Sequence, residues 1–238
     1  MKNKKGRAVL LTKLFLYQTI RYFIIGGGAF LLLNKWARTR FQKFRIQETP
    51  VSSKQLSTEI KYSLITLFIF SVFFSTILSP SFSPYIKLYS DPNSYSLWWA
   101  ILSIPLLIIL HDTFFYWMHR TLHHKIFYNK FHRTHHLSTN PTPFASFSFH
   151  PVEALFEAIW VLPVLVVVPI HRYSLLTFAF ISFLNNIKGH LGFELSRGRP
   201  RFLNTSTHHS MHHRYFKSNY GLYFLFWDRI CKTEGPTA

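Results

Sequence analysis

The sequence predicts an all-α protein, an integral membrane helical bundle, on three observations. Hydrophobic residues make up 48% of the 238 residues and charged residues only 15%, which is too apolar for a soluble basic protein. Several apolar runs approach or exceed the roughly 18–20 residues that cross a bilayer as a helix. Ten of the fourteen histidines gather in two short segments, 119–136 and 208–213. These segments indicate a histidine-rich, metal-binding cap at one end of the bundle.

The net charge of +18 has two physical explanations. A basic protein can bind nucleic acid. Here, however, the basic residues flank the apolar runs and do not line one amphipathic face, which is how membrane proteins mark their cytoplasmic side. We therefore expect a membrane and no nucleic acid as partner. The single cysteine, Cys231, excludes a disulfide, a cysteine-ligated zinc site and an iron–sulfur cluster within one chain.

The first apolar run covers about residues 14–33 and is interrupted by Gly26-Gly27-Gly28. It is too long for the core of a signal peptide, and basic residues follow it where a cleavage site would lie. Both its flanks are basic, so the charge rule does not orient it, and we leave open whether it crosses the membrane. Residues 34–61 are expected to form a basic cytoplasmic linker, and 62–79 a cleaner transmembrane helix.

The next segment, 80–96, contains three prolines and little positive charge, which predicts a loop on the outer side. Residues 97–118 then form a span that runs back inward, with Pro105 as its expected kink. This span brings the first histidine segment to the cytoplasmic face. Residues 1–107 are thus expected to be an N-terminal membrane region of about two to three transmembrane helices.

Two shorter apolar runs, 152–170 and 173–187, follow the first histidine segment. Both histidine segments must lie on the same side of the membrane if they bind one metal cluster. The two runs therefore cross as a pair or not at all. Pro163 and Pro169 favour a helical hairpin at about 152–187 that penetrates only part of the bilayer. From Lys188 onward the chain is polar and basic, which predicts a cytoplasmic location.

The histidine spacing is that of residues on one helical face, three or four positions apart. The sets are His119 and His123; His132, His135 and His136; and His209, His212 and His213. Imidazole suits zinc, copper, iron and nickel, and this many rings indicate two metal ions. There is no HExxH motif of a zinc protease and no Glu-x-x-His pair of soluble di-iron bundles. We expect ligands that are nearly all nitrogen.

The three sets of histidines can be written as histidine boxes: HxxxH (119–123), HxxHH (132–136) and HxxHH (209–213). The boxes lie near three further motifs, YWMHR (116–120), PTPFASFSFHPVE (141–153) and NYG…WDR (219–229). Together they resemble the fatty acid hydroxylase / sterol desaturase superfamily of integral membrane di-metal oxidases, nearest its sterol C5-desaturase branch. The resemblance covers about residues 108–233. It implies a fatty acid hydroxylase-like catalytic domain over 108–238 and a cytoplasmic, histidine-rich di-metal cap on the helical bundle.

The resemblance also implies the cofactors and their ligands. The implied cofactors are two non-haem iron ions, with O2 as co-substrate, and zinc can replace iron in such a site. The eight histidines of the three boxes correspond to family ligands. His124 fits the HxxxxH spacing of some members, so the choice between His123 and His124 stays open. His190 lies where many members place one more ligand, and Glu194 could share its helical face.

Two acidic residues are candidate catalytic residues, Asp112 and Glu194. Asp112 lies seven residues before His119 and could orient it as a ligand. Asp112 and His111 also lie near lipid depth, where ionisable residues are usually functional; a purely structural role inside the bundle is the other interpretation. His208 precedes the last box and could ligate a metal or cap a helix.

The implied function is O2-dependent hydroxylation or desaturation of a lipid, either sterol-like or fatty-acyl. The chain contains no flavin or dinucleotide fingerprint, so we expect an external electron carrier, cytochrome b5-like or a ferredoxin with its reductase. The alternatives are a histidine-rich membrane metal-binding or transport protein and a b-type haem protein. We favour a bacterial inner membrane over the endoplasmic reticulum. The sequence does not specify the lipid, the reaction type or the oligomeric state.

Overall fold

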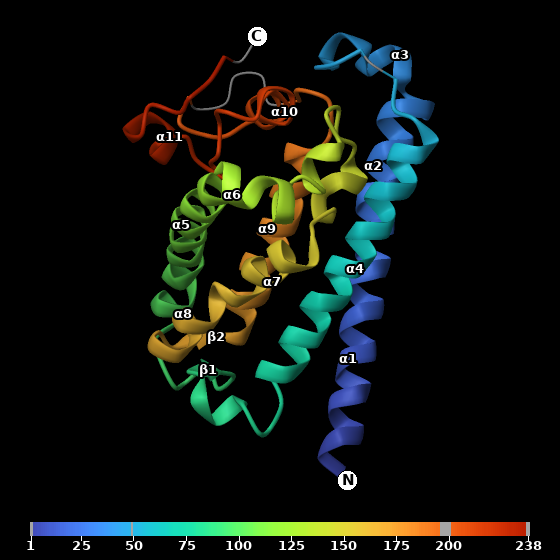
Figure 1. Cartoon of the computed structure of the whole chain (residues 1–238). Coiled ribbons are helices and arrows are strands. Elements are labelled where there is room, and N and C mark those ends of the chain that lie inside the picture. Colours follow the sequence, from blue (N-terminus) through green and yellow to red (C-terminus); the bar gives the residue numbers. More distant parts are fainter. Residues whose placement is uncertain (1, 49, 196–200, 237–238) are drawn as a thin grey trace.

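The computed structural model describes residues 2–48, 50–195 and 201–236, and it is a mostly helical bundle, as the sequence predicted (Figure 1). Three helical segments in the described ranges are long and apolar enough to cross a membrane: Lys5–Trp36, Ser53–Ile77 and Leu97–Leu122. We therefore describe the chain as an integral membrane protein.

The N-terminal segment is one nearly continuous helix rather than a broken run. The helix α1 (Lys2–Arg21) continues through the π-helical turn Tyr22–Gly27 and through α2 (Gly28–Leu31) to a second π-helical turn, Leu32–Trp36. The three glycines do not end the helix. Gly26 and Gly27 lie where it meets the loop around Pro143, and a Cβ on Gly26 would lie 3.7 Å from the carbonyl oxygen of Pro143. Lys5–Trp36 is long enough to cross a bilayer.

The helix α4 (Ser53–Ile77) corrects the expected linker over residues 34–61. It begins nine residues before the apolar run, at an N-cap where the Ser52 hydroxyl accepts from the backbone N–H of Gln55. α3 (Arg38–Phe41) and a 3-10 turn lie between Trp36 and the start of α4, and they fill part of the same region. The first turns of α4 contain Glu59, which is fully buried and accepts from Gln55 and Thr142. The polar first turns of α4 cannot be recognised from apolar runs in the sequence.

The helix α5 (Leu97–Leu122) extends beyond the expected end at residue 118. Its N-cap is Ser96, whose hydroxyl accepts from Trp99 N–H, and Pro105 lies inside it. The extension carries His119 on the last turn, with His123 as the C-cap. The ligand candidates of the first box are therefore fixed directly by a long helix.

At the opposite end of the bundle, two short strands join distant loops. β1 (Leu88–Tyr89) pairs in parallel with β2 (Ile170–His171), and these are the only strands in the described ranges. Lys87 Nζ also donates to the carbonyl of Val167 at 3.0 Å. The expected outer loop 80–96 is thereby tied to the turn before the helix α9 (Arg172–Gly189).

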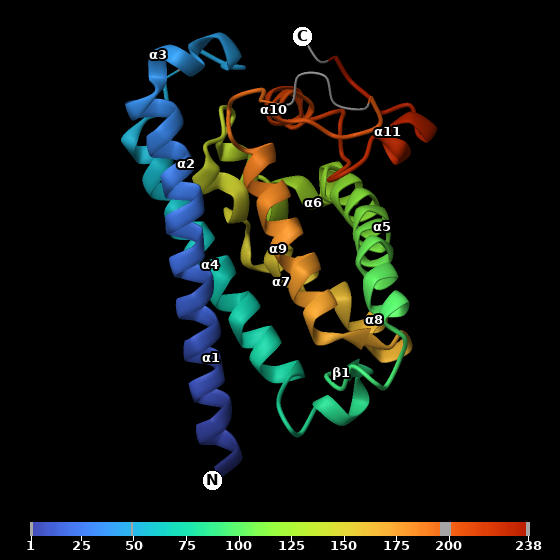
Figure 2. The ribbon, with the colours of Figure 1, turned by 180° about the vertical axis from the view of Figure 1, so that it is seen from behind.

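The middle of the bundle is formed by α7 (Pro151–Ile159), α8 (Val161–Val167) and α9 (Arg172–Gly189). α9 lies between α1 and α4 on one side and α5 on the other (Figure 2). α10 (Ser206–Tyr215) and α11 (Phe226–Ile230) cover the end of the bundle where α5 and α9 finish (Figure 1). The polar, basic segment after Lys188 includes residues 196–200, which lie outside the described residues.

Candidate metal centre

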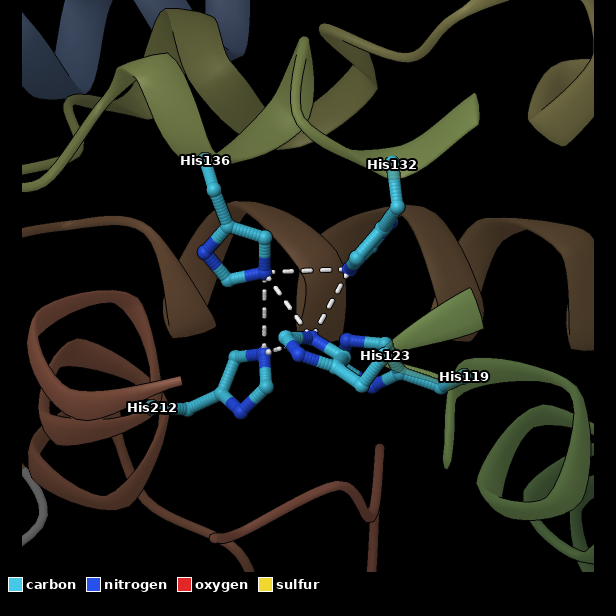
Figure 3. A group of neighbouring side chains, drawn as sticks. All are labelled: His119, His123, His132, His136 and His212. Carbon is cyan, nitrogen blue, oxygen red and sulfur yellow. Dashed lines mark hydrogen bonds between the residues drawn. The ribbon is translucent and has the colours of Figure 1, made fainter. Parts of the chain in front are cut away.

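Nine histidines converge at one end of the bundle in two adjacent groups. In each group the candidate ligand atoms all lie within 4.8 Å of one another. The first group, drawn in Figure 3, is His119, His123, His132, His136 and His212; the second is His135, His190, His209 and His213. Each group combines rings that are far apart in the sequence, so both histidine segments contribute to both groups.

The elements that hold these rings are less regular than the spacing suggests. His119 lies on α5 and the three histidines of the last box on α10, as a helical pattern predicts. The middle box is different, because His132 ends a π-helical turn (Tyr128–His132) and the next two histidines form a 3-10 turn (His135–Leu137). Both HxxHH boxes are divided between the two groups, although the last one lies on a regular α-helix. His132 and His136 face the first group and His135 faces the second.

In the first group the Nε2 atoms lie very close together (Figure 3). The Nε2 of His136 is 3.0 Å from that of His132 and 3.2 Å from that of His212. The Nε2 of His123 lies 3.0 and 3.1 Å from the same two atoms. Four nitrogens thus face one point.

In several of these rings the opposite nitrogen is held by a hydrogen bond that fixes the tautomer, although His136 Nδ1 has no partner among the described residues. The Nδ1 of His119 donates to the carbonyl of Tyr220 at 2.9 Å, and that of His212 donates to Ser218 at 2.7 Å. Since a carbonyl only accepts, each Nδ1 carries the proton and each Nε2 presents a lone pair inward. His119 Nε2 has no hydrogen-bond partner among the described residues.

This arrangement fits a metal ion. Neutral rings with their protons on Nδ1 cannot hydrogen-bond to one another through Nε2, so lone pairs about 3 Å apart repel unless a cation lies between them. With a metal–nitrogen bond of about 2.1 Å, two ligands at right angles are about 3.0 Å apart. The observed spacing is that of neighbouring ligands on one ion.

The second group has Nε2 atoms that are similarly close, and one of its rings is fixed by a backbone carbonyl. His209 Nε2 lies 3.0 Å from that of His190 and 3.2 Å from that of His213. His190 Nδ1 donates to the carbonyl of Asn186 at 2.8 Å. Gly189 allows the close approach of α10, because a Cβ there would lie only 3.3 Å from the His209 ring. The two groups together fit two metal ions.

Burial keeps these rings neutral. It lowers the pKa of His190 to about 4, and it lowers the pKa of His132, His136 and His209 well below the ordinary value near 6.5, with neighbouring histidines adding to the effect. A metal binds the neutral ring, and so these imidazoles are ready to bind without losing a proton at neutral pH.

Two further histidines of the segments 119–136 and 208–213 lie outside both groups. His124 is exposed and is the N-cap of α6 (Lys125–Phe127), where its Nδ1 accepts from Ile126 N–H. His208 forms a capping box with Thr205 at the start of α10. Of the two alternatives in the first box, the structure brings His123 and not His124 to the other rings.

The two expected catalytic carboxylates are not brought to the histidines. Asp112 accepts backbone N–H bonds from residues 222–224, the shortest being 2.7 Å from Tyr223. Glu194 Oε2 accepts from the backbone N–H and the hydroxyl of Thr207, near the start of α10. Both hold the backbone that carries or supports the ligands.

Sequence reasoning missed the acidic residue that does contact a ligand. Glu153 Oε1 lies 2.8 Å from His132 Nδ1, so it fixes that ring as a carbonyl fixes its neighbours. Glu153 lies within the HPVE stretch at the start of α7. In the sequence, Glu153 follows His150, the N-cap of α7, by three residues. That spacing indicates the start of a helix and does not indicate contact with a metal ligand.

Comparison with known proteins agrees with this geometry. Residues 104–233 match the family model described as fatty acid hydroxylase. The lathosterol oxidase of Homo sapiens is 34% identical over 179 residues, covering 74% of this chain and 60% of that protein. The Delta(7)-sterol 5(6)-desaturase of Leptosphaeria maculans is 30% identical over 221 residues, covering 91% of this chain and 58% of that protein.

The chain thus spans about three fifths of the length of these relatives. No solved structure shows a significant match to it. The family model covers more than half of the chain and includes every histidine of the two groups. The chain therefore belongs to the fatty acid hydroxylase family.

Proposed function

We propose that the chain is a membrane-bound non-haem di-iron oxidoreductase that uses O2 and an external electron donor to hydroxylate or desaturate a sterol-like lipid. The observation that supports this most directly is the pair of buried imidazole groups at the end of an apolar helical bundle. The names of its relatives, a lathosterol oxidase and a sterol desaturase, indicate the substrate class.

The chain's own residues have three tasks in this function. The nine histidines would hold two iron ions, which when bound supply the activation of O2 and the oxidation of an unreactive C–H bond. Glu153 and the carbonyls of Tyr220 and Ser218 keep the rings in the ligating tautomer. Buried rings around the groups, such as Phe149 against His135, exclude water from the reaction.

The proposal includes a membrane orientation and an electron source. We place the metal centre on the cytoplasmic side, because Lys125, Lys130 and Arg133 flank its histidines and the loop 80–96 at the opposite end holds Lys87 alone. The basic start of α1 lies at that opposite end too (Figure 1) and is the one charged segment that does not follow this rule. Electrons come from a separate carrier, either cytochrome b5-like or a ferredoxin with its reductase. The bacterial inner membrane is the favoured location, with the endoplasmic reticulum as the alternative.

A metal transporter fits the geometry less well. Transporters bind their cargo near the bilayer midplane, whereas His119 is on the last turn of α5 and His123 is its C-cap. The second candidate function is therefore not favoured by the position of the groups.

The deciding experiment combines metal analysis with lipid mass spectrometry. Cells that produce the wild type are expected to contain a lipid with one oxygen more or two hydrogens fewer, and His135→Ala abolishes it. His124→Ala, which removes an exposed capping histidine, keeps the product. An iron-loaded, reduced wild-type protein that changes no lipid would refute the proposal.

A further inference from the structure

One histidine remains after the metal groups and the helix caps are assigned. The chain has fourteen histidines, and nine belong to the two groups. Four more bond to backbone N–H groups at helix starts: His124, His150, His171 and His208. The remaining histidine is His111, which is buried in the middle of the bundle on α5.

His111 lines a partly open cavity of about 120 Å³. The cavity lies between α1 and α4 on one side and α5, α7 and α9 on the other, and phenylalanine is the commonest residue in its walls. Glu157 on α7 and Arg21 on α1 line it as well. In the described part of the chain, one polar atom of each of these three side chains has no hydrogen-bond partner: Arg21 Nε, His111 Nε2 and Glu157 Oε1.

The His111 ring is fixed by two contacts, and its Nε2 has no hydrogen-bond partner among the described residues. It stacks on Trp160, with ring centroids 4.4 Å apart and an angle of 12° between planes. Its Nδ1 lies 3.0 Å from the hydroxyl of Tyr223. Its Nε2 lies 3.7 Å from Glu157 Oε2, and the two side chains are only 7% and 9% exposed. That distance is too long for a direct hydrogen bond, and buried polar atoms left without a partner are costly.

A hydroxyl group from a ligand would bond to both side chains, giving His111 Nε2 its missing partner and binding Glu157 through Oε2, the oxygen next to the unpartnered Oε1. An oxygen about 2.8 Å from each atom fits a pair that is 3.7 Å apart. The hydroxyl donates its hydrogen to the Glu157 carboxylate and accepts from His111 Nε2–H. A carboxylate ligand would be repelled by Glu157, and a ketone could not donate to it. The pair therefore suits an alcohol.

The other end of the cavity borders the second metal group. Phe149 lines the cavity, and its ring centroid is 5.1 Å from that of His135. Asn186 also lines it, and its carbonyl accepts from the ring of His190. A molecule bound at His111 thus lies beside the wall of the metal centre. A cavity of about this size holds one small ring, which corresponds to the hydroxyl-bearing end of a larger lipid.

We propose that His111 and Glu157 bind the free hydroxyl group of the lipid substrate, select hydroxylated lipids and set which carbon faces the second metal group. This inference rests on the proposed function for the identity of the ligand as a substrate. It concerns the membrane-embedded part of the chain rather than the metal ligands themselves.

The test compares the binding of two labelled molecules to the purified full-length protein in detergent. Tritiated cholesterol carries the hydroxyl, and tritiated cholestane has the same rings without it. The wild type is expected to bind cholesterol at least about tenfold more tightly, as the gain of a hydrogen bond to a buried charged group predicts. Glu157→Leu and His111→Phe reduce this preference to about twofold or less. His111→Phe keeps an aromatic ring to stack on Trp160.

The controls are Glu48→Leu and His124→Phe, which change exposed residues outside the cavity and keep the tenfold preference. If Glu157→Leu does not fold, Glu157→Gln removes the charge with little change of shape and is expected to weaken the preference. A folded Glu157 variant that keeps the full preference overturns the inference, as does a wild type that binds both sterols equally.

Failure of this inference is distinguishable from failure of the proposed function. If the iron-loaded wild type oxidises lipids with and without a hydroxyl equally well, the hydroxyl site is wrong and the oxidase stands. If it oxidises no lipid but its hydroxyl preference in binding depends on Glu157, the binding site stands and the oxidase is wrong.

Discussion

The Nδ1 atom of His132 lies 2.8 Å from Oε1 of Glu153, and both side chains are almost completely buried. Burial raises the pKa of Glu153 well above its ordinary value, and the neighbouring Glu157 adds to this. The bond to His132 thus joins two groups that have no access to solvent. A ligand ring held in this way binds metal more tightly than a freely rotating one.

Replacing Glu153 should weaken the first metal group. In Glu153→Leu the His132 ring loses the acceptor that fixes its tautomer, and we expect roughly 10–100-fold weaker metal binding. Titration of the metal-free protein with Zn²⁺ measures this directly. Glu48→Leu, a change of an exposed carboxylate, is the matched control. Unchanged affinity in Glu153→Leu would show that the contact does not support the site.

The two groups should lose metal separately. His212 belongs to the first group and His209 to the second, so each replacement by alanine should lower the iron content from about two ions per chain to about one. Elemental analysis of purified protein gives the count. His124→Ala is the control, because His124 is exposed and caps α6. Complete loss of iron in both single variants would mean that the groups bind as one unit.

The metal-free protein should become less stable as the pH falls below about 6.5. The pKa of His190 is lowered by burial to about 4 in the folded state. Between pH 6.5 and pH 4 the unfolded chain therefore binds more protons than the folded one, so stability falls as the pH falls, by up to about 1.4 kcal/mol per pH unit for each such ring.

Thermal unfolding of the metal-free protein at pH 8 and pH 5 measures this effect. The midpoint is expected to be lower at pH 5, and Zn²⁺ added at pH 8 is expected to raise it. Equal midpoints at the two pH values would contradict the neutral state of the buried rings.

Asp112 should act on stability rather than on the metal. Its carboxylate accepts N–H bonds from residues 222–224 and lies outside both histidine groups. Asp112→Asn is expected to cost about 1–3 kcal/mol and to lower the thermal midpoint, while the folded fraction keeps its iron. Reduced iron content in fully folded Asp112→Asn would instead support the orienting role that the sequence suggested.

Much of the fold follows from local patterns in the sequence. The spans within α4 and α5 were found from apolar length alone, and their ends were not. The polar start of α4 is stabilised by partners from another segment, since Glu59 accepts from Thr142. A contact between residues so far apart leaves no periodic pattern.

The residues of the candidate site were likewise predicted in part from the sequence. The three boxes identified eight of the converging histidines, and the resemblance supplied His190. The choice between His123 and His124 depends on where α5 ends, and it ends at Leu122. The sequence spacing allowed both. Likewise Glu153 meets His132 only because α7 packs against the π-helical turn that contains this ring.

The hydrogen bond from His119 to the carbonyl of Tyr220 joins residues 101 positions apart. At roughly 5–20 residues per second, a ribosome needs about 5–20 seconds to lengthen the chain from one to the other. His119 is therefore synthesised seconds before the backbone that fixes its ring. The first metal group can consequently be complete only after the chain has been made through Tyr220.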